Sequence, residues 1–181
     1  MISLRRGTVS LVPYDSTWAN EFDKEKAILE QAFGDKVLAI EHVGSTAVPG
    51  LAAKPIIDIE IGLEKFDDYK ELVPLAESVG YQFMPDRIFD EYVLMPKGSE
   101  DCRTHYLHFA VVGSDEWNNV IGFRNILRSN SRLRDEYADV KAKLASANTS
   151  NRAAYTVAKS DFIERALSAG AHKNDTVDTS S

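Results

Sequence analysis

The chain has 181 residues, of which 44% are hydrophobic, and a formal net charge of -7 at pH 7. This length can bury one hydrophobic core, and the acidic balance argues against an extended surface that tracks nucleic-acid phosphates. We therefore expect small-molecule partners.

From the sequence we expect neither a secretory leader nor a membrane span. The stretch GTVSLVPYDSTW after Arg5 and Arg6 is too interrupted for a signal peptide, and no apolar run has the length of a spanning helix. The single cysteine, Cys102, cannot form an internal disulfide, which fits a reducing compartment. We expect a cytoplasmic protein with no membrane partner, and the sequence leaves the oligomeric state open.

The first predicted elements are a helix and a strand. An extended segment at 9–14 leads to Asp15 and its polar neighbours, which supply cap residues for a helix that ends at Gly34. The apolar side of this helix carries Trp18, Phe22, Leu29 and Phe33. The β-branched segment 37–43 predicts a strand that runs directly into a glycine-serine turn.

A second strand is predicted at 55–63, with the sequence PIIDIEIGL. Successive side chains of a strand point to opposite faces, so Asp58 and Glu60 share one face. The other face carries Ile57, Ile59, Ile61 and Leu63. Two acids therefore lie side by side on one surface of the strand.

The middle of the chain predicts one helix and a hairpin. Residues 66–79 have a helical pattern, in which Pro74 either opens a new helix or kinks the existing one. Strands at 91–95 and 104–112, joined by the turn-rich KGSEDCR, predict an antiparallel hairpin. If Leu107, Phe109 and Val111 form the apolar face of the second of these strands, His108 points to the opposite side.

The last part of the chain is predicted to be helical. Ser114 or Asp115 can cap the first of three helices, and the third covers 151–169. The tail at 171–181 lacks apolar periodicity, so we expect it to be disordered.

The order of these elements predicts an α+β fold in which a small mixed β-sheet packs against helices. We expect a single domain over 1–170, whose C-terminal portion, at about 114–169, is helical. A fold of this class does not by itself assign a function.

The chemically informative segment is HVGSTAVPGLAAKPIIDIEIG. Gly44 lets the backbone approach a phosphate closely, and Ser45 adds a hydroxyl donor beside exposed N–H groups. Asp58 and Glu60 offer the oxygen ligands that Mg²⁺ or Mn²⁺ prefers, and such ions assist in-line displacement at phosphorus. The pattern predicts a site for a cation and a polyphosphate. The alternatives are a plain turn at Gly44 and a solvated strand face with two ordinary acids.

The turn and the acids also carry a family resemblance. Gly44-Ser45, followed after twelve residues by the segment from Asp58 to Glu60, resembles the signature of nucleotidyltransferases of the DNA polymerase β type. More narrowly, HVGSTAVPGLAAKPIIDI, THYLHF and FRNILRSN are similar to GrpB-like proteins, and the likeness extends over 9–167. This resemblance implies a nucleotidyltransferase fold that binds ATP or another nucleoside triphosphate with a divalent cation. It also implies transfer of a nucleoside monophosphate to a small-molecule acceptor, which the sequence does not identify.

The strand at 104–112 departs from the superfamily pattern. Active members add a third carboxylate from a later strand, whereas THYLHFAVV contains no acid. His108 lies where that acid is expected, and it could complete the metal shell, act as a base, or bind a phosphate when protonated. The missing acid bears more on catalysis than on binding.

Four cationic or ionisable residues are further candidates for holding the phosphates. Lys54 precedes the acidic strand, and His105 lies close to His108 in sequence. The family resemblance adds Arg124 and Lys159, both on predicted helices. The alternatives are an exposed lysine at 54, a local hydrogen bond for His105, and ordinary surface cations on the helices.

The leading hypothesis is a metal-dependent nucleotidyltransferase with catalytic and metal-binding residues Asp58, Glu60 and His108. A rival hypothesis is a non-catalytic module that binds a nucleotide or phosphometabolite with an incomplete metal site. A third is a ligase-like or phosphotransfer enzyme on the same fold.

Overall fold

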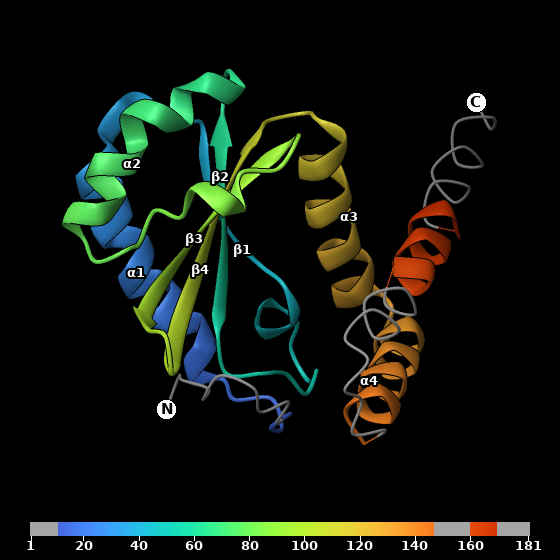
Figure 1. Ribbon diagram of the computed structural model, residues 1–181. Coiled ribbons are helices and arrows are strands. Elements are labelled where there is room, and N and C mark those ends of the chain that lie inside the picture. The colour runs from blue at the N-terminus through green and yellow to red at the C-terminus, as the bar shows by residue number, and fades with distance from the viewer. Residues whose placement is uncertain (1–10, 147–159, 170–181) are drawn as a thin grey trace. The chain divides into compact units, whose positions relative to one another are not determined.

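A computed structural model describes residues 11–146 and 160–169 of the chain (Figure 1). The chain divides into two compact units, Met1–Val120 and Ile121–Ser181. The first unit contains a four-stranded mixed sheet with helices, and the described part of the second unit is helical. The predicted α+β fold with a helical C-terminal portion is confirmed, while the single domain over 1–170 stays a prediction.

The sheet joins its strands in the order β1 (Ala39–Val43), β2 (Ile57–Leu63), β4 (Cys102–Val111) and β3 (Tyr92–Ser99). β1 is antiparallel to β2, β2 is parallel to β4, and β4 is antiparallel to β3. The sheet is therefore mixed, and the predicted hairpin of the last two strands is confirmed.

β3 continues past its predicted end at Met95. Pro96 has no N–H, but its carbonyl accepts a hydrogen bond from the N–H of Gln82 at 2.9 Å, on the side away from β4. Because the N–H and C=O of a strand residue point the same way, the missing donor also faces away from β4, and proline is tolerated there. The strand then passes through an irregularity between Lys97 and Gly98.

The hydrophobic core lies between the sheet and two helices, α1 (Thr17–Phe33) and α2 (Tyr69–Ser78), which Figure 1 shows on one side of the sheet. Trp18, Leu29 and Phe33 of α1 belong to this core. The inward positions of the two central strands are 0% exposed, and they are Ile57, Ile59, Ile61, Leu63, Leu107 and Phe109. Burial of each such side chain contributes about 1.5–3 kcal/mol, so this face fixes the register of the sheet.

The starts of the two helices resolve two points that the sequence left open. Oδ1 of Asp15 accepts hydrogen bonds from the N–H of Thr17 at 2.9 Å and from its hydroxyl at 2.8 Å, while Ser16, at the cap position of α1, makes no capping bond with its side chain. α2 begins at Tyr69, after a 3-10 turn at Phe66–Asp68, and Pro74 lies inside it. The alternative in which Pro74 opens a new helix is therefore wrong.

The helices of the C-terminal part are α3 (Asp115–Ser129), α4 (Ser131–Ser146) and a helix at 160–169. α3 begins in the first unit and continues into the second. The N-terminal part of the helix predicted at 151–169 lies outside the described residues, as does the predicted tail.

Aromatic rings join the three helical segments of the second unit. The ring centroid of Tyr137 on α4 lies 5.1 Å from that of Phe123 on α3 and 5.2 Å from that of Phe162. The second unit therefore has a small aromatic core of its own. Across the described parts of both units, no helix combines the length and the apolar character needed to cross a membrane.

Candidate functional site

Asp58 and Glu60 lie on the face of β2 that points away from the core. Val43 of β1 pairs with Asp58, and His108 of the parallel strand β4 pairs with Glu60. The two acids and His108 therefore occupy one surface, as the alternation of the sequence predicts.

Asp58 and His108 form the exposed edge of this group. Oδ1 of Asp58 lies 3.7 Å from Nε2 of His108, and the two side chains are 31% and 24% exposed. Burial lowers the pKa of His108, but the adjacent Asp58 and the charges of Glu60 and Glu116 outweigh burial and raise it above its ordinary value. The protonated imidazole is thus favoured while the acids around it are charged.

Glu60 is the buried member of the group. It is 1% exposed, and among the described residues no hydrogen-bond partner reaches its Oε1 atom. Burial raises the pKa of Glu60 to about 7; His108 opposes this shift, and Glu116 and Asp58 add to it. A buried carboxylate oxygen without a partner is unfavourable in a folded protein, which points to a missing ligand or proton.

Gly44 places the turn after β1 against Asp58. Its φ is +69°, in the region that favours glycine, and a Cβ atom there would lie 3.0 Å from Cβ and Cγ of Asp58 and overlap its Oδ2 atom. Ser45 follows, half-buried, at the start of a 3-10 turn, Ser45–Ala47. The backbone of the turn and the carboxylate are therefore within reach of a single ligand.

Buried groups behind the turn hold it in place. The Thr46 hydroxyl donates to the carbonyl of Ile56 at 3.3 Å, and its oxygen then accepts from Nε2 of His42 at 3.0 Å. The His42 ring stacks on Phe22, with centroids 4.7 Å apart. Thr46 thus ties the turn to the segment that leads into β2, and the turn is built before any ligand arrives.

Glu116, in the first turn of α3, is an acid near the site that the sequence reasoning missed. A Cβ atom on Gly62 of β2 would meet the Trp117 ring at 3.1 Å, so the start of α3 lies over this face of the sheet. The charge of Glu116 raises the pKa of Glu60, and burial raises the pKa of Glu116 itself. The sequence predicted only a capped helix here. Ser114 provides this cap, because its Oγ accepts a hydrogen bond from the N–H of Trp117 at 3.3 Å.

The donor set fits a hard divalent cation in part. Two carboxylates on one face and the orphaned Oε1 of Glu60 are suitable oxygen ligands. Over the described ranges, no three His, Cys, Asp or Glu residues are placed to hold one ion together. Mg²⁺ is commonly held by one or two carboxylates plus substrate phosphates and water, so a pair of acids is consistent with a cation that arrives with a nucleotide.

The structure does not bring His105 to this group. Its partner in the sheet register is Ile57, so His105 lies on the core face, opposite to Asp58. There its Nε2 lies 4.0 Å from Oε2 of Glu25, while Nδ1 lies 2.9 Å from the Thr104 hydroxyl. Burial lowers its pKa, against the charge of Glu25. The prediction that His105 joins the phosphate site is corrected, because strand alternation sends residues 105 and 108 to opposite faces.

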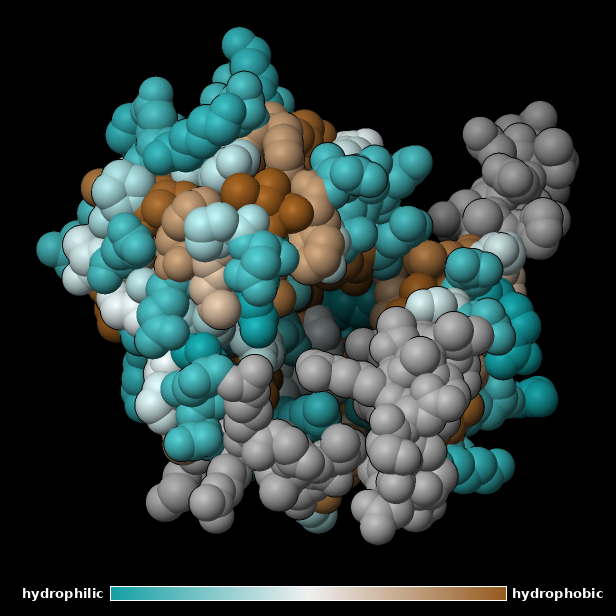
Figure 2. All heavy atoms as spheres, viewed as in Figure 1, coloured by the Kyte–Doolittle hydropathy of each residue, from teal (hydrophilic) through white to brown (hydrophobic). Residues whose placement is uncertain are grey.

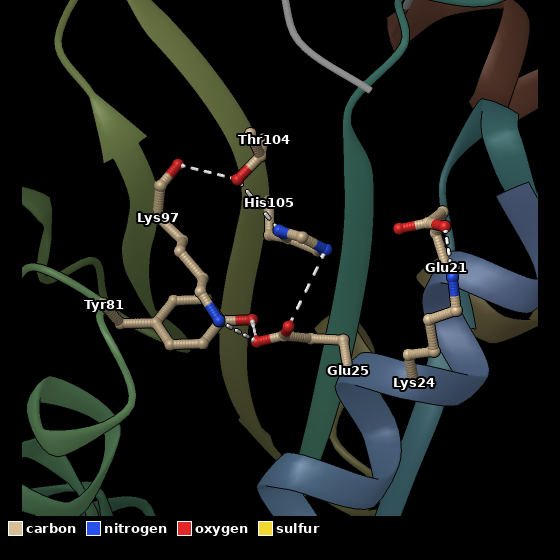
Figure 3. A network of polar contacts seen from close by, with 7 residues as sticks. All are labelled: Glu21, Lys24, Glu25, Tyr81, Lys97, Thr104 and His105. Atoms are coloured by element: carbon tan, nitrogen blue, oxygen red, sulfur yellow. Dashed lines mark hydrogen bonds and ion pairs between the residues drawn. The ribbon is translucent and has the colours of Figure 1, made fainter. Parts of the chain in front are cut away.

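Glu25 is the centre of the cluster that surrounds His105 (Figure 3). Its Oε1 accepts from Nζ of Lys97 at 2.7 Å and from the hydroxyl of Tyr81 at 2.9 Å. Burial, together with the charge and hydrogen bond of Glu25, raises the pKa of Tyr81. Neither Glu25 nor Lys97 was a candidate from the sequence, where Glu25 appears only as a polar interruption of the apolar side of α1.

The remaining predicted cations are Lys54, Arg124 and Lys159. Lys54 is half-buried three residues before β2 begins, and its carbonyl accepts from the N–H of Ile56 at 2.8 Å. Arg124 is buried on the part of α3 that belongs to the second unit, where its Nε donates to Oδ1 of Asn125 at 3.1 Å. Lys159 lies outside the described residues. The phosphate-binding roles of these three residues stay predictions.

The fold and the site define a class of protein: an α+β protein whose mixed sheet carries two acids beside a glycine turn. The GrpB protein family matches residues 8–169, and the chain belongs to this family.

Individual relatives agree with the family match. The glutamate-rich protein GrpB of Alkalihalophilus pseudofirmus is 33% identical over 171 residues, covering 92% of this chain and 98% of that protein. A UPF0157 protein of Halalkalibacterium halodurans is 37% identical, covering 88% of this chain and 81% of that protein. The crystal structure of the conserved protein GrpB from Enterococcus faecalis superimposes with a TM-score of 0.73 at 29% identity, covering 86% of this chain and 98% of that chain.

Proposed function

We propose that the protein is a metal-dependent nucleotidyltransferase of the polymerase β type, which transfers a nucleoside monophosphate from ATP or another nucleoside triphosphate to a small acceptor. The observation that carries the proposal is the buried Glu60, whose Oε1 has no hydrogen-bond partner among the described residues, on the same strand face as Asp58. A cation bound by these acids would provide the missing positive charge.

The position of each residue in the site suggests its role. Asp58 and Glu60 hold the cation, which when bound supplies positive charge to the phosphates. The backbone turn at Gly44 and Ser45, which lies against Asp58, receives the polyphosphate. His108, whose pKa is raised, donates to a phosphate oxygen in its protonated form more readily than it removes a proton. This favours phosphate binding among the roles that the sequence left open for His108.

Calorimetry with ATP and Mn²⁺, run beside an assay for released pyrophosphate, tests the proposal. Wild-type protein should bind ATP only with the metal, and Asp58→Ala should abolish this binding. Asp101→Ala removes an exposed acid from the turn between β3 and β4 and should leave binding unchanged. Equal ATP affinity of the wild type and Asp58→Ala would contradict the proposal.

A second candidate function is a non-catalytic module that binds a nucleotide or phosphometabolite. It is favoured by the absence of a third acid on β4 and of a three-residue ligand group in the described part of the chain. Metal-dependent ATP binding without pyrophosphate release over a broad set of hydroxyl and amine acceptors would select this candidate.

A further inference from the structure

A hollow of about 410 Å³ lies next to the proposed site, in the first unit. It is lined by Phe89, Asp90, Glu91 and Tyr92, from the segment that leads into β3, and by Glu116 of α3. Its volume falls in the range of small-molecule sites, which is about 300–1,000 Å³. The proposed nucleotidyl transfer gives no role to the first four of these residues.

Aromatic rings connect the hollow to the acids on β2. The rings of Phe89 and Tyr92 stack with their centroids 4.5 Å apart and an interplanar angle of 19°. The Tyr92 ring lies 6.1 Å from the ring of His108, which in turn faces Asp58. A molecule held against these rings would therefore lie beside the reacting phosphates.

The aromatic wall is open to solvent. Phe89 is 42% exposed and its neighbour Ile88 is 39% exposed. Figure 2 shows hydrophobic side chains at the surface of the first unit, in the part of the view where the segment between α2 and β3 lies. Exposed rings next to a hollow are typical of a ligand site.

The charge of the hollow is negative. Of its five lining residues three are acids and none is basic. Burial raises the pKa of Glu116, and the charge of Glu91 adds to this shift. Burial also raises the pKa of Tyr92, with smaller contributions from the charges of Glu116 and Glu60. Two acids of the lining therefore repel each other, and the buried carboxylate of Glu60 adds to the same negative potential.

Acids combined with stacked rings select one ligand chemistry. A carboxylate pairs with an ammonium or guanidinium group, and an aromatic face attracts the same cation. A bare metal ion gains little from the rings, and a neutral nucleobase leaves the acids without a counter-charge. We propose that this hollow is the acceptor subsite and that the acceptor is an organic cation, an amine or guanidine; this assignment rests on the proposed function.

The test is a binding experiment that needs neither nucleotide nor metal. Benzylamine and the neutral benzyl alcohol, which have similar size, are titrated separately into the full-length protein and followed by amide NMR signals. Benzylamine should shift the signals of residues 89–92 and 116, with at least tenfold higher affinity than benzyl alcohol. Equal affinity for the two probes, or no shift of these signals, would overturn the proposal.

Substitutions in the lining test whether benzylamine binds in the hollow. Glu116→Gln and Phe89→Leu should each weaken benzylamine binding at least threefold, while Asp101→Asn, which neutralises an exposed acid outside the lining, should not. Unchanged amide spectra away from the substituted positions show that the variants are folded. Benzylamine affinity unaffected by both lining variants would place the cation elsewhere and overturn the proposal.

A final titration separates this inference from the proposed function. Benzylamine should bind equally well when ATP and Mn²⁺ are bound, because an acceptor and a nucleotide occupy the site together. Competition between them, or displacement of benzylamine by adenosine, would show that the rings hold the nucleobase instead. If the wild-type protein binds benzylamine but not ATP, both nucleotidyl transfer and the acceptor assignment are wrong, and the hollow is only a cation site. If it binds ATP with Mn²⁺ but not benzylamine, this inference alone is wrong.

Discussion

The two faces of the sheet treat their buried acids differently. On the face that packs under α1, Glu25 is buried and its carboxylate is paired, because Lys97 and Tyr81 both donate hydrogen bonds to it. On the opposite face Glu60 is buried with one oxygen unpaired among the described residues, and two acids, Asp58 and Glu116, raise its pKa further. The first cluster is complete without a ligand, whereas the second retains an unfavourable charge that a bound cation would remove.

Breaking the complete cluster should have the largest effect on stability. Glu25→Ala leaves Lys97 without its carboxylate and Tyr81 without its acceptor, so we expect a loss of about 3 kcal/mol, at the low end for a buried pair because Lys97 is 23% exposed. Urea denaturation measures this loss. Glu21→Ala on the same helix removes a surface pair with Lys24 and should lose less than about 0.5 kcal/mol. Similar losses for the two variants would contradict the distinction between the clusters.

The incomplete cluster should respond to pH with the opposite sign from an ordinary paired acid. The folded pKa of Glu60 is about 7 and its ordinary value is 4.5, so the folded state holds its proton more tightly than the unfolded state. Stability from this group is present below pH 4.5 and is lost as pH rises to about 7. At pH 7, where the folded group is half ionised, the loss reaches about 3 kcal/mol, at about 1.4 kcal/mol for each pKa unit.

Glu60→Gln checks this pH dependence, because the amide resembles the protonated acid and does not titrate. The difference in free energy of unfolding between wild type and variant, followed by urea denaturation from pH 4 to 8 without metal, should move in favour of the variant as pH rises. Parallel curves would mean that Glu60 titrates normally. With Mn²⁺ and ATP present, the difference should shrink, since the cation then stabilises the charged form.

Gly44→Ala should combine backbone strain with a steric overlap. We expect a loss of about 2 kcal/mol, because φ is +69° and the new methyl group would overlap the Asp58 carboxylate. Gly34→Ala is the matched control: its φ is +55°, and a Cβ atom there meets nothing within 4 Å. The difference between the two losses, measured by thermal unfolding, reports the contact with Asp58. Equal losses would mean that the turn and the acid are independent.

Asp58→Ala should have the smallest effect on stability. The substitution removes a charge that repels Glu60, so its free energy of unfolding should stay within about 0.5 kcal/mol of the wild type although ATP binding is lost. Chemical denaturation beside calorimetry measures both quantities. An unfolded variant, or one that keeps its ATP affinity, would show that Asp58 is a structural residue like Glu25.

Local patterns in the sequence were enough to place the central acids. The alternation of PIIDIEIGL set which face of β2 carries Asp58 and Glu60, and a glycine directly after β1 marked the turn beside them. The same alternation in THYLHF sends His105 to the face of Leu107, opposite to His108. The grouping of His105 with the site was therefore an error that the sequence itself could have corrected.

Side-chain contacts between segments that are distant in the sequence could not be predicted from the sequence. The position of Glu116 depends on Trp117 packing over Gly62, and the hollow depends on the segment before β3 lying beside the start of α3. Glu25 is paired because Tyr81 and Lys97, far along the chain, meet it across the core. None of these pairs has a fixed spacing in the sequence.

The sequence by itself determined most of the elements and the face of β2 that holds the acid pair, because helix and strand periodicity depend on neighbouring residues only. The tertiary structure alone decided which acids are paired, which one has a buried oxygen that no described residue contacts by a hydrogen bond, and which rings and charges lie next to it. Burial and charge pairing depend on how distant segments pack, so they emerge only when the chain has folded.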